Sequence, residues 1–287
     1  MKNSVEIKNL CKNYDQFSLK DVSFNVPTGY IMGFIGQNGA GKTTTIKSIL
    51  NMLRHDSGEI VMFGQDTKNS DLSQNDSVGV VLDNPFFVED WNANDVESAV
   101  SLFYKKWDKE KFDGLLKKFK IDRKKKIKEL SRGMKVKIMV SVALSHDAKL
   151  LMLDEPTSGL DPVARDELCE LLADFVIDED KSVLFSTHIT SDLEKIADYI
   201  TFILDGQIVF TGTKEDLLEK YVSVKGGISD VDLEQKNMII GFREHQTGFD
   251  GMIDLENMKN LPQNLLFEPV SLDEIIVYMN REGEKNE

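Results

Sequence analysis

The chain has 287 residues, a length that suits one large domain or one domain with an appendage. Hydrophobic residues make up 41% of it and charged residues 29%, values near the averages for soluble globular proteins, which excludes a fibrous or largely disordered chain. The formal net charge of -14 disfavours DNA or RNA as a partner, because non-specific binding to nucleic acids depends on basic residues.

The cysteines and the apolar runs predict a chain that is neither exported nor membrane-spanning. Cys11 and Cys169 have no metal-type spacing and no second pair beside them, which disfavours a disulfide framework or a zinc site. The first residues lack the apolar core of a signal peptide. No run approaches the ~20 apolar residues that span a bilayer. If the protein acts at a membrane, we therefore expect another chain to supply the membrane part.

Short apolar runs recur along the chain and predict buried strands. They cover residues 31–35, 78–82, 150–153, 183–186 and 200–204. Helical patterns lie between them, for example at 43–53 and 162–176, and this alternation predicts an α/β layered domain. Asp205 and Gly206, followed by the apolar residues 208–210, predict a two-residue hairpin turn and an antiparallel edge strand.

The segment GQNGAGKT at residues 36–43 fits the phosphate-binding pattern G-x-x-x-x-G-K-[ST], after a predicted strand and at the start of a predicted helix. In such a loop, backbone N–H groups and the helix N-terminus converge on phosphate oxygens, and Lys42 adds a full positive charge. A glycine-rich turn without a ligand is the alternative. Thr43 is also predicted to ligate Mg²⁺. The predicted nucleotide-binding residues of this segment are Gly36, Gln37, Asn38, Gly39, Ala40, Gly41, Lys42, Thr43 and Thr44.

Two adjacent carboxylates, Asp154 and Glu155, follow the predicted strand at 150–153. Adjacent acids at the end of a buried strand are costly unless they are paired or hydrated, and open α/β sheets bind ligands at this end. Asp154 is predicted to belong to the Mg²⁺ site, and Glu155 to be the general base that activates water. Solvated acids in the next turn are the alternative.

In this order, the motifs resemble those of the nucleotide-binding subunit of an ATP-binding cassette (ABC) transporter, over roughly residues 5–212. Tyr14 lies where this family stacks an aromatic ring on adenine, and an ordinary tyrosine is the alternative. The segment LSRGM at 130–134 occupies the place of the family's LSGGQ signature, which is offered to the ATP of the partner subunit. The resemblance implies that Ser131 and Gly133 bind that ATP. A serine, a glycine and a helix N-terminus also form an anion site on physical grounds.

Two further residues match the family pattern. Asp161 ends the segment PTSGLD, which in the family communicates across the dimer, and a simple helix cap is the alternative. His188 follows the predicted strand at 183–186 and matches the family's histidine that contacts the γ-phosphate. The resemblance therefore implies a catalytic role for His188 beside Glu155.

The chain departs from the family pattern at three positions. Asp83 stands where a glutamine usually contacts Mg²⁺ and links ATP to the transmembrane partner; it keeps an oxygen ligand for the metal but adds a negative charge. Within the signature, Arg132 and Met134 replace a glycine and a glutamine. Weaker or slower closure on ATP is one expected consequence, whereas loss of activity is not implied.

The sequence predicts two domains: an ABC cassette at 1–220, with a helical subdomain at about 86–142, and a small appendage at 221–287 that ends in a helix. Ser271 and Glu274 form a capping box at the start of that helix.

The helical subdomain carries aromatic residues that form either its core or a partner-binding patch: Trp91, Phe103, Tyr104, Trp107 and Phe112. A basic run there predicts a solvated face, with anionic lipid or an acidic partner as the alternative: Lys117, Lys118, Lys120, Arg123, Lys124, Lys125, Lys126 and Lys128.

The interpretation favoured by the resemblance is an α/β P-loop NTPase cassette that binds ATP and Mg²⁺ and hydrolyses ATP to ADP and phosphate. Two cassettes, identical or different, would close on ATP and drive a separate transmembrane permease from the cytoplasmic face of the cell membrane, as in bacterial exporters. The alternatives are a soluble ABC ATPase outside transport, for example in cofactor assembly, and a nucleotide-gated sensor that barely hydrolyses ATP.

Overall fold

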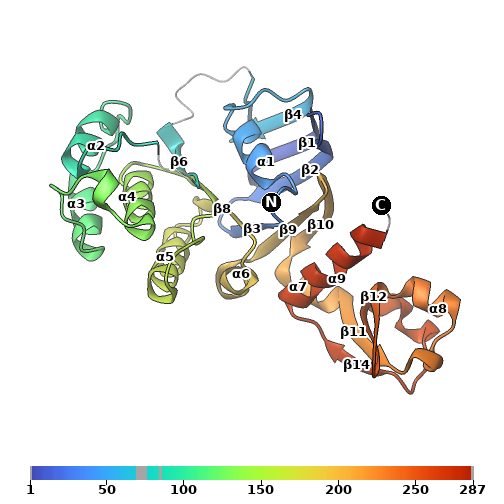
Figure 1. The fold of residues 1–287 in the computed structure, drawn as a ribbon. Coiled ribbons are helices and arrows are strands. Elements are labelled where there is room, and N and C mark those ends of the chain that lie inside the picture. Colours follow the sequence, from blue (N-terminus) through green and yellow to red (C-terminus); the bar gives the residue numbers. More distant parts are fainter. Residues whose placement is uncertain (1, 69–75, 84–85, 286–287) are drawn as a thin grey trace. The chain divides into compact units, whose positions relative to one another are not determined.

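The computed structural model describes residues 2–68, 76–83 and 86–285 (Figure 1). The chain divides into two compact units, Met1–Val209 and Phe210–Glu287, and each is described by itself. The boundary predicted at residue 220 lies at the end of α7 (Lys214–Lys220), within the second unit.

The first unit begins with an antiparallel sheet in the strand order β2-β1-β4-β5 (Figure 1). Its strands are β1 (Asn3–Asn13), β2 (Ser18–Pro27), β4 (Ser57–Met62) and β5 (Gln65–Asp66). Along β2 the buried residues alternate with exposed ones, so this sheet turns one face toward the core and the other toward solvent.

The central sheet has six strands in the order β10-β9-β3-β8-β7-β6. They are β3 (Ile31–Ile35), β6 (Val78–Val81), β7 (Leu150–Asp154), β8 (Ser182–Thr187), β9 (Tyr199–Leu204) and β10 (Gln207–Thr213). The five buried strands predicted from apolar runs are confirmed, and β3, β6, β7, β8 and β9 pair in parallel. Asp205 and Gly206 both have positive φ and form the predicted hairpin turn before the edge strand β10.

Helix α1 (Lys42–Ile49) lies between the two sheets, and its buried Ile46 and Ile49 share one core with residues of both. The helix ends four residues before the predicted end at 53, because Asn51 adopts the left-handed conformation that terminates many helices. On the opposite face of β3, Leu193 of α6 (Thr190–Ile196) lies against Gly33. The long helix α5 (Pro162–Phe175) packs on α6.

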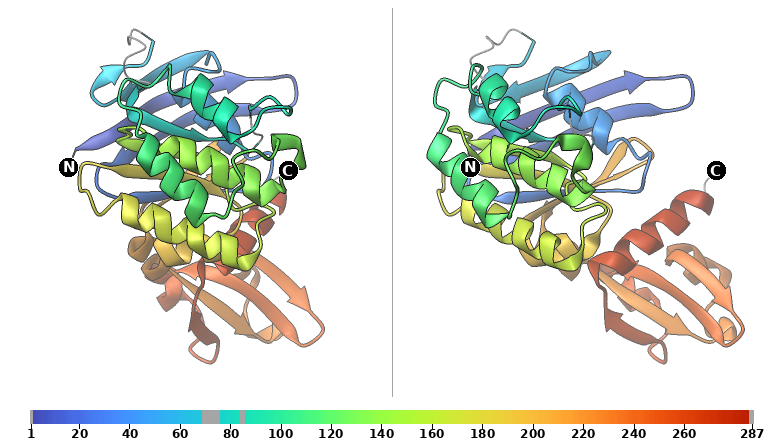
Figure 2. Two further views of the ribbon diagram at one scale, coloured as in Figure 1. Left: turned by 90° about the vertical axis from the view of Figure 1, so that its left-hand side faces the viewer. Right: turned by 60° about the vertical axis from the view of Figure 1, so that its left-hand side comes forward.

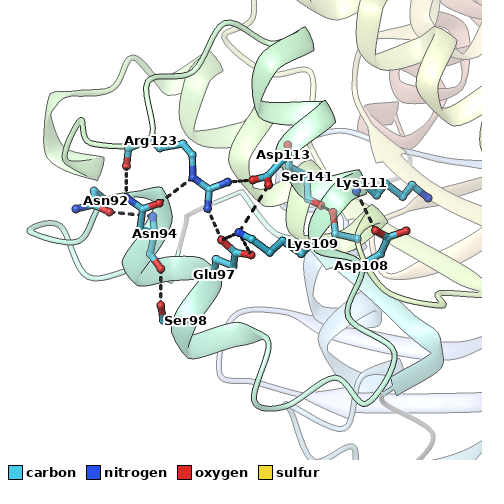
Figure 3. Close-up of polar contacts among 11 residues, drawn as sticks. Asn92, Asn94, Glu97, Ser98, Asp108, Lys109, Lys111, Asp113, Arg123 and Ser141 are labelled. Carbon is cyan, nitrogen blue, oxygen red and sulfur yellow. Dashed lines mark hydrogen bonds and ion pairs between the residues drawn. The ribbon is translucent and has the colours of Figure 1, made fainter.

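Between β6 and β7 the chain forms a helical subdomain, in which α2 and α3 pack on α4 (Figure 2). Its elements are α2 (Ala93–Val100), α3 (Lys109–Lys118), a 3-10 turn (Ile127–Glu129) and α4 (Arg132–Leu144). Arg123 holds α2 and α3 together, because its guanidinium contacts Asn94, Glu97 and Asp113 (Figure 3). In the basic run, Lys126 and Lys128 form ion pairs with Asp90. These members are therefore partly neutralised within the subdomain.

The second unit contains an antiparallel sheet in the order β12-β13-β11-β14, with its own apolar core around Val224, Phe249 and Ile253. Its elements are α7, β11 (Tyr221–Gly226), α8 (Leu233–Met238), β12 (Ile240–His245), β13 (Gly248–Asp254), β14 (Leu266–Pro269) and α9 (Leu272–Lys285), with 3-10 turns at Ile228–Asp230 and Leu255–Asn260. The predicted capping box is present, with the Ser271 hydroxyl accepting from Glu274 N and the Glu274 carboxylate accepting from Ser271 N. Within the described residues, no helix is both long and apolar enough to cross a membrane.

Candidate nucleotide site

The phosphate-binding loop joins the end of β3 to the start of α1. Gly41 has a φ of 114°, and a Cβ there would come within 2.5 Å of Leu19 Cδ2, so only glycine fits at this turn. The Lys42 side chain is 5% exposed. Its Nζ donates to the carbonyl oxygens of Gly36 at 2.7 Å and Gln37 at 3.2 Å. The ammonium group is thus held against the loop that the sequence pattern assigns to phosphate.

The carboxylate of Asp154, at the end of β7, is buried and points to the start of α1. Its Oδ2 accepts from Thr43 Oγ1 at 2.7 Å, and its Oδ1 accepts from Ser186 Oγ at 2.6 Å. The residue is 1% exposed, so its charge is nearly removed from bulk water. A carboxylate and a hydroxyl are the hard oxygen donors that Mg²⁺ takes beside nucleotide phosphates. The donor set present therefore fits a Mg²⁺ site.

Glu155 connects the phosphate-binding loop to His188. It has a φ of 50°, rare for a residue with a side chain, and its N–H donates to the Ser186 carbonyl at 3.0 Å. Its Oε1 lies 3.1 Å from Lys42 Nζ, and its Oε2 lies 2.7 Å from His188 Nδ1. The structure thus brings Lys42, Glu155 and His188, which are far apart in the sequence, into one contact network.

A cavity of about 430 Å³ borders this network, within the size range of ligand pockets. Asp83 and Glu155 line it together with Phe17 and with most of the phosphate-binding loop, namely Gln37, Asn38, Gly39, Gly41, Lys42, Thr43 and Thr44. Tyr14 is not among the lining residues; it is 46% exposed, and its ring stacks on Phe17 with a centroid distance of 6.5 Å. The two rings form one aromatic surface next to the cavity.

The predicted signature and the loop at 156–161 lie side by side but outside this cavity. Ser131 caps α4, because its Oγ accepts from Met134 N at 3.3 Å. A Cβ at Gly133 would come within 3.2 Å of Leu160 Cδ2. Asp161 caps α5, and hydrogen bonds from the N–H groups of Ala164 and then Val163 hold the pKa of its carboxyl below the usual value. Within one chain, these residues do not meet Lys42.

A second cavity, of about 400 Å³, is apolar and lies between the central sheet and the helical subdomain. Its lining residues come from the turn after α1, from β6 and the segment after it, from the end of α2 and the turn after it, and from α4: Leu50, Met52, Val78, Val80, Leu82, Phe86, Phe87, Val100, Phe103, Tyr104, Met139 and Val142. We call this cavity the apolar groove. Of the predicted aromatic residues, Phe112 is fully buried in the subdomain, whereas Phe103 is 78% exposed at the groove.

Two residues of the site were not predicted from the sequence. Ser186 contacts Asp154 because β7 and β8 are neighbours in the register that places these two residues opposite each other. Phe17 reaches the cavity from the turn between β1 and β2. The available signal for Ser186 was its place just before Thr187 and His188 at the end of a strand. No pattern in the sequence distinguishes Phe17 from a core phenylalanine.

A parallel α/β sheet with a phosphate-binding loop, a buried aspartate and an adjacent glutamate at its carboxyl edge defines a P-loop nucleotide hydrolase. The family model of ABC transporters matches residues 19–158. The chain is 30% identical over 231 residues to the ABC transporter ATP-binding protein YtrB of Bacillus subtilis. The alignment covers 80% of this chain and 79% of YtrB. It is also 33% identical over 208 residues to the lantibiotic transport ATP-binding protein SrtF of Streptococcus pyogenes. That alignment covers 71% of this chain and 89% of SrtF.

A solved structure described as the ATP-binding subunit of an ABC transporter superposes with a TM-score of 0.65 at 27% identity, over 74% of this chain and 91% of that one. The chain belongs to the ABC transporter family. It is an ATP-binding cassette of that family and an ATPase, as its sequence motifs predicted.

Proposed function

We propose that this cassette drives a separate transmembrane permease from the cytoplasmic face of the membrane, as one of two cassettes that close on ATP and Mg²⁺. The observation that carries the proposal is the contact network in which Lys42, Glu155 and His188 meet at the cavity of the phosphate-binding loop. The similarity to the lantibiotic transport protein SrtF favours a transporter of the exporter type.

In this proposal, Lys42 and the loop N–H groups bind the β- and γ-phosphates, and Tyr14 stacks on adenine beside Phe17. Thr43 and Asp154 would hold Mg²⁺, and Asp83 lies at the edge of the cavity that Thr43 also lines. When bound, the ion would supply positive charge that offsets negative charge on the phosphates. The predicted signature residues Ser131 and Gly133, with Asp161, serve the nucleotide of the second cassette, since they lie outside the cavity of their own chain.

Glu155 is proposed to accept a proton from the attacking water, whose oxygen bonds to the γ-phosphorus as the bond to the bridging oxygen of ADP breaks. His188 is proposed to position this carboxylate through its contact with Oε2, and to contact the γ-phosphate as the family resemblance implies. Before water attacks, the contact between Lys42 and Glu155 must loosen, because phosphate oxygens compete for the same ammonium group.

The apolar groove is the proposed contact site for a cytoplasmic segment of the permease. Phe86 and Phe103 are 71% and 78% exposed, which is unusual for residues of this size unless a partner covers them. The groove also borders Leu82, directly before Asp83 of the nucleotide cavity. A partner bound in the groove would therefore contact Leu82, whose neighbour in the sequence, Asp83, lines the nucleotide cavity.

The decisive experiment for the site compares Glu155→Gln with the parental protein. A positioned general base contributes about 10²- to 10⁴-fold to a rate, so we expect turnover of ATP to fall by that order while ATP affinity stays within about a factor of three. Turnover is measured by phosphate release and affinity by calorimetry.

The matched control is Glu170→Gln, the same substitution on the exposed face of α5, which should leave both quantities unchanged. Parental turnover in the Glu155→Gln protein would remove Glu155 from the role of base. A loss of ATP affinity equal to the loss of turnover would show instead that this residue acts in binding.

A further inference from the structure

Two of the positions at which the chain departs from the family pattern contact each other. Arg132, the first residue of α4, donates from its NH2 group to Oδ1 of Asp83 at 2.6 Å. Both side chains are about half exposed, at 53% and 47%. Because Asp83 lines the nucleotide cavity, this ion pair connects the edge of that cavity to the start of α4 within one chain.

Arg132 is unfavourably placed with respect to its own helix. The N-terminus of a helix carries partial positive charge, and the first turn of α4 holds no acidic residue to offset a cation. Its ion-pair partner Asp83 lies outside the helix. The Arg132 side chain also passes close to Gly159, where an added Cβ would come within 3.1 Å of Arg132 Cδ.

We propose that Arg132 is a positioning residue for Asp83, and that Mg²⁺-bound nucleotide competes with Arg132 for the Asp83 carboxylate. This inference rests on the proposed function of the cavity. A divalent ion next to the cavity attracts a carboxylate more strongly than a single guanidinium does, and an exposed ion pair is weak enough to be exchanged. Filling the cavity would thus free the start of α4 from its contact with Asp83.

The test is a double-mutant cycle on nucleotide affinity in the full-length protein, using a non-hydrolysable ATP analogue with Mg²⁺ and calorimetry. The four proteins are the parental one, Arg132→Gln, Asp83→Asn and the double variant. With the Asp83 carboxylate present, Arg132→Gln should tighten binding of the Mg²⁺-loaded analogue by roughly two- to fivefold, because it removes the competitor. In the Asp83→Asn background the same change should produce no tightening.

Three controls separate this role from a structural one. Arg132→Lys keeps the cation and should retain parental affinity. Lys126→Gln breaks the comparably exposed pair with Asp90, away from the cavity, and should also leave affinity unchanged. With EDTA in place of Mg²⁺, Arg132→Gln should no longer tighten binding.

Equal effects of Arg132→Gln in the two Asp83 backgrounds, or tightening that persists in EDTA, would overturn the inference while leaving the proposed function intact. A parental protein that does not bind the Mg²⁺-loaded analogue would overturn both. Thermal melts of all variants verify folding; Arg132→Gln is expected to fold normally, since it removes a cation from a helix N-terminus.

Discussion

At the scale of single residues, burial and polar contacts fix the position of the Lys42 ammonium group in the site. The side chain is almost fully buried, and within the described part of the chain its ammonium group contacts two loop carbonyls and one carboxylate. Such a buried ammonium is stable only because these oxygen atoms surround it. The same arrangement keeps it in reach of phosphate oxygens that enter the cavity.

We therefore predict that Lys42→Ala reduces ATP affinity by at least about tenfold in calorimetry with Mg²⁺ present, because loss of one charge-assisted hydrogen bond to phosphate costs about 1.5 to 3 kcal/mol. Lys47→Ala, on the same helix but outside the cavity lining, is the matched control and should bind ATP like the parental protein. Equal affinities for Lys42→Ala and Lys47→Ala would contradict the assignment of the loop.

The sequence predicted that Thr43 and Asp154 belong to one Mg²⁺ site, but it did not predict every contact of the site. The contacts of Lys42 with Glu155 and of Thr43 with Asp154 follow from two local patterns, each placed at the carboxyl end of a parallel strand. Ser186 depends on the order of strands in the sheet, which local patterns do not encode. The pair between Asp83 and Arg132 joins two segments 49 residues apart and was equally out of reach.

At the scale of elements, the apolar groove could not be predicted from local sequence patterns. The sequence showed that the helical subdomain is rich in aromatic residues, but it did not distinguish the core residue Phe112 from the exposed Phe103. Helical periodicity places a residue on a face of its own helix, whereas exposure depends on how α2, α3 and α4 pack. Strands and their order of appearance were predictable because buried parallel strands are continuous apolar runs.

We predict that Phe103→Ser reduces recovery of the permease when the tagged cassette is purified from native membranes by several-fold, because it removes an exposed aromatic ring from the groove. The ATPase rate of the isolated cassette should not change. Leu102→Ser is a close control: Leu102 is 84% exposed and adjacent in the chain, but it does not line the groove. If both variants recover the permease equally well, the contact site lies elsewhere.

At the scale of the whole molecule, one chain holds an incomplete set of the residues expected at an ABC nucleotide site. The cavity at Lys42 lacks Ser131 and Gly133, and these stand at the exposed start of α4 with the N-terminal partial charge of that helix. A second cassette that presents this helix N-terminus to the γ-phosphate would complete the site. The nucleotide would then hold the two chains together until it is hydrolysed.

We accordingly predict that the Glu155→Gln protein forms a dimer in ATP and Mg²⁺, because the variant retains binding but hydrolyses the nucleotide that joins the two chains about 10²- to 10⁴-fold more slowly. Size-exclusion chromatography at several protein concentrations measures this. Adding Ser131→Arg should prevent the dimer, since a long side chain at the start of α4 would occupy the place of the partner's phosphate.

The control for lost capping is Asn92→Arg in the same Glu155→Gln background. Asn92 caps α2 much as Ser131 caps α4, with its side chain accepting from Asn94 N and Asp95 N, but α2 contributes nothing to the nucleotide cavity. Both arginine variants therefore lose a cap of similar value and gain the same side chain. Dimerisation that survives Asn92→Arg and fails with Ser131→Arg assigns the effect to the phosphate contact. A Glu155→Gln protein that stays monomeric at high concentration, or a Ser131→Arg variant that dimerises as readily as Asn92→Arg, would contradict closure of two cassettes on ATP.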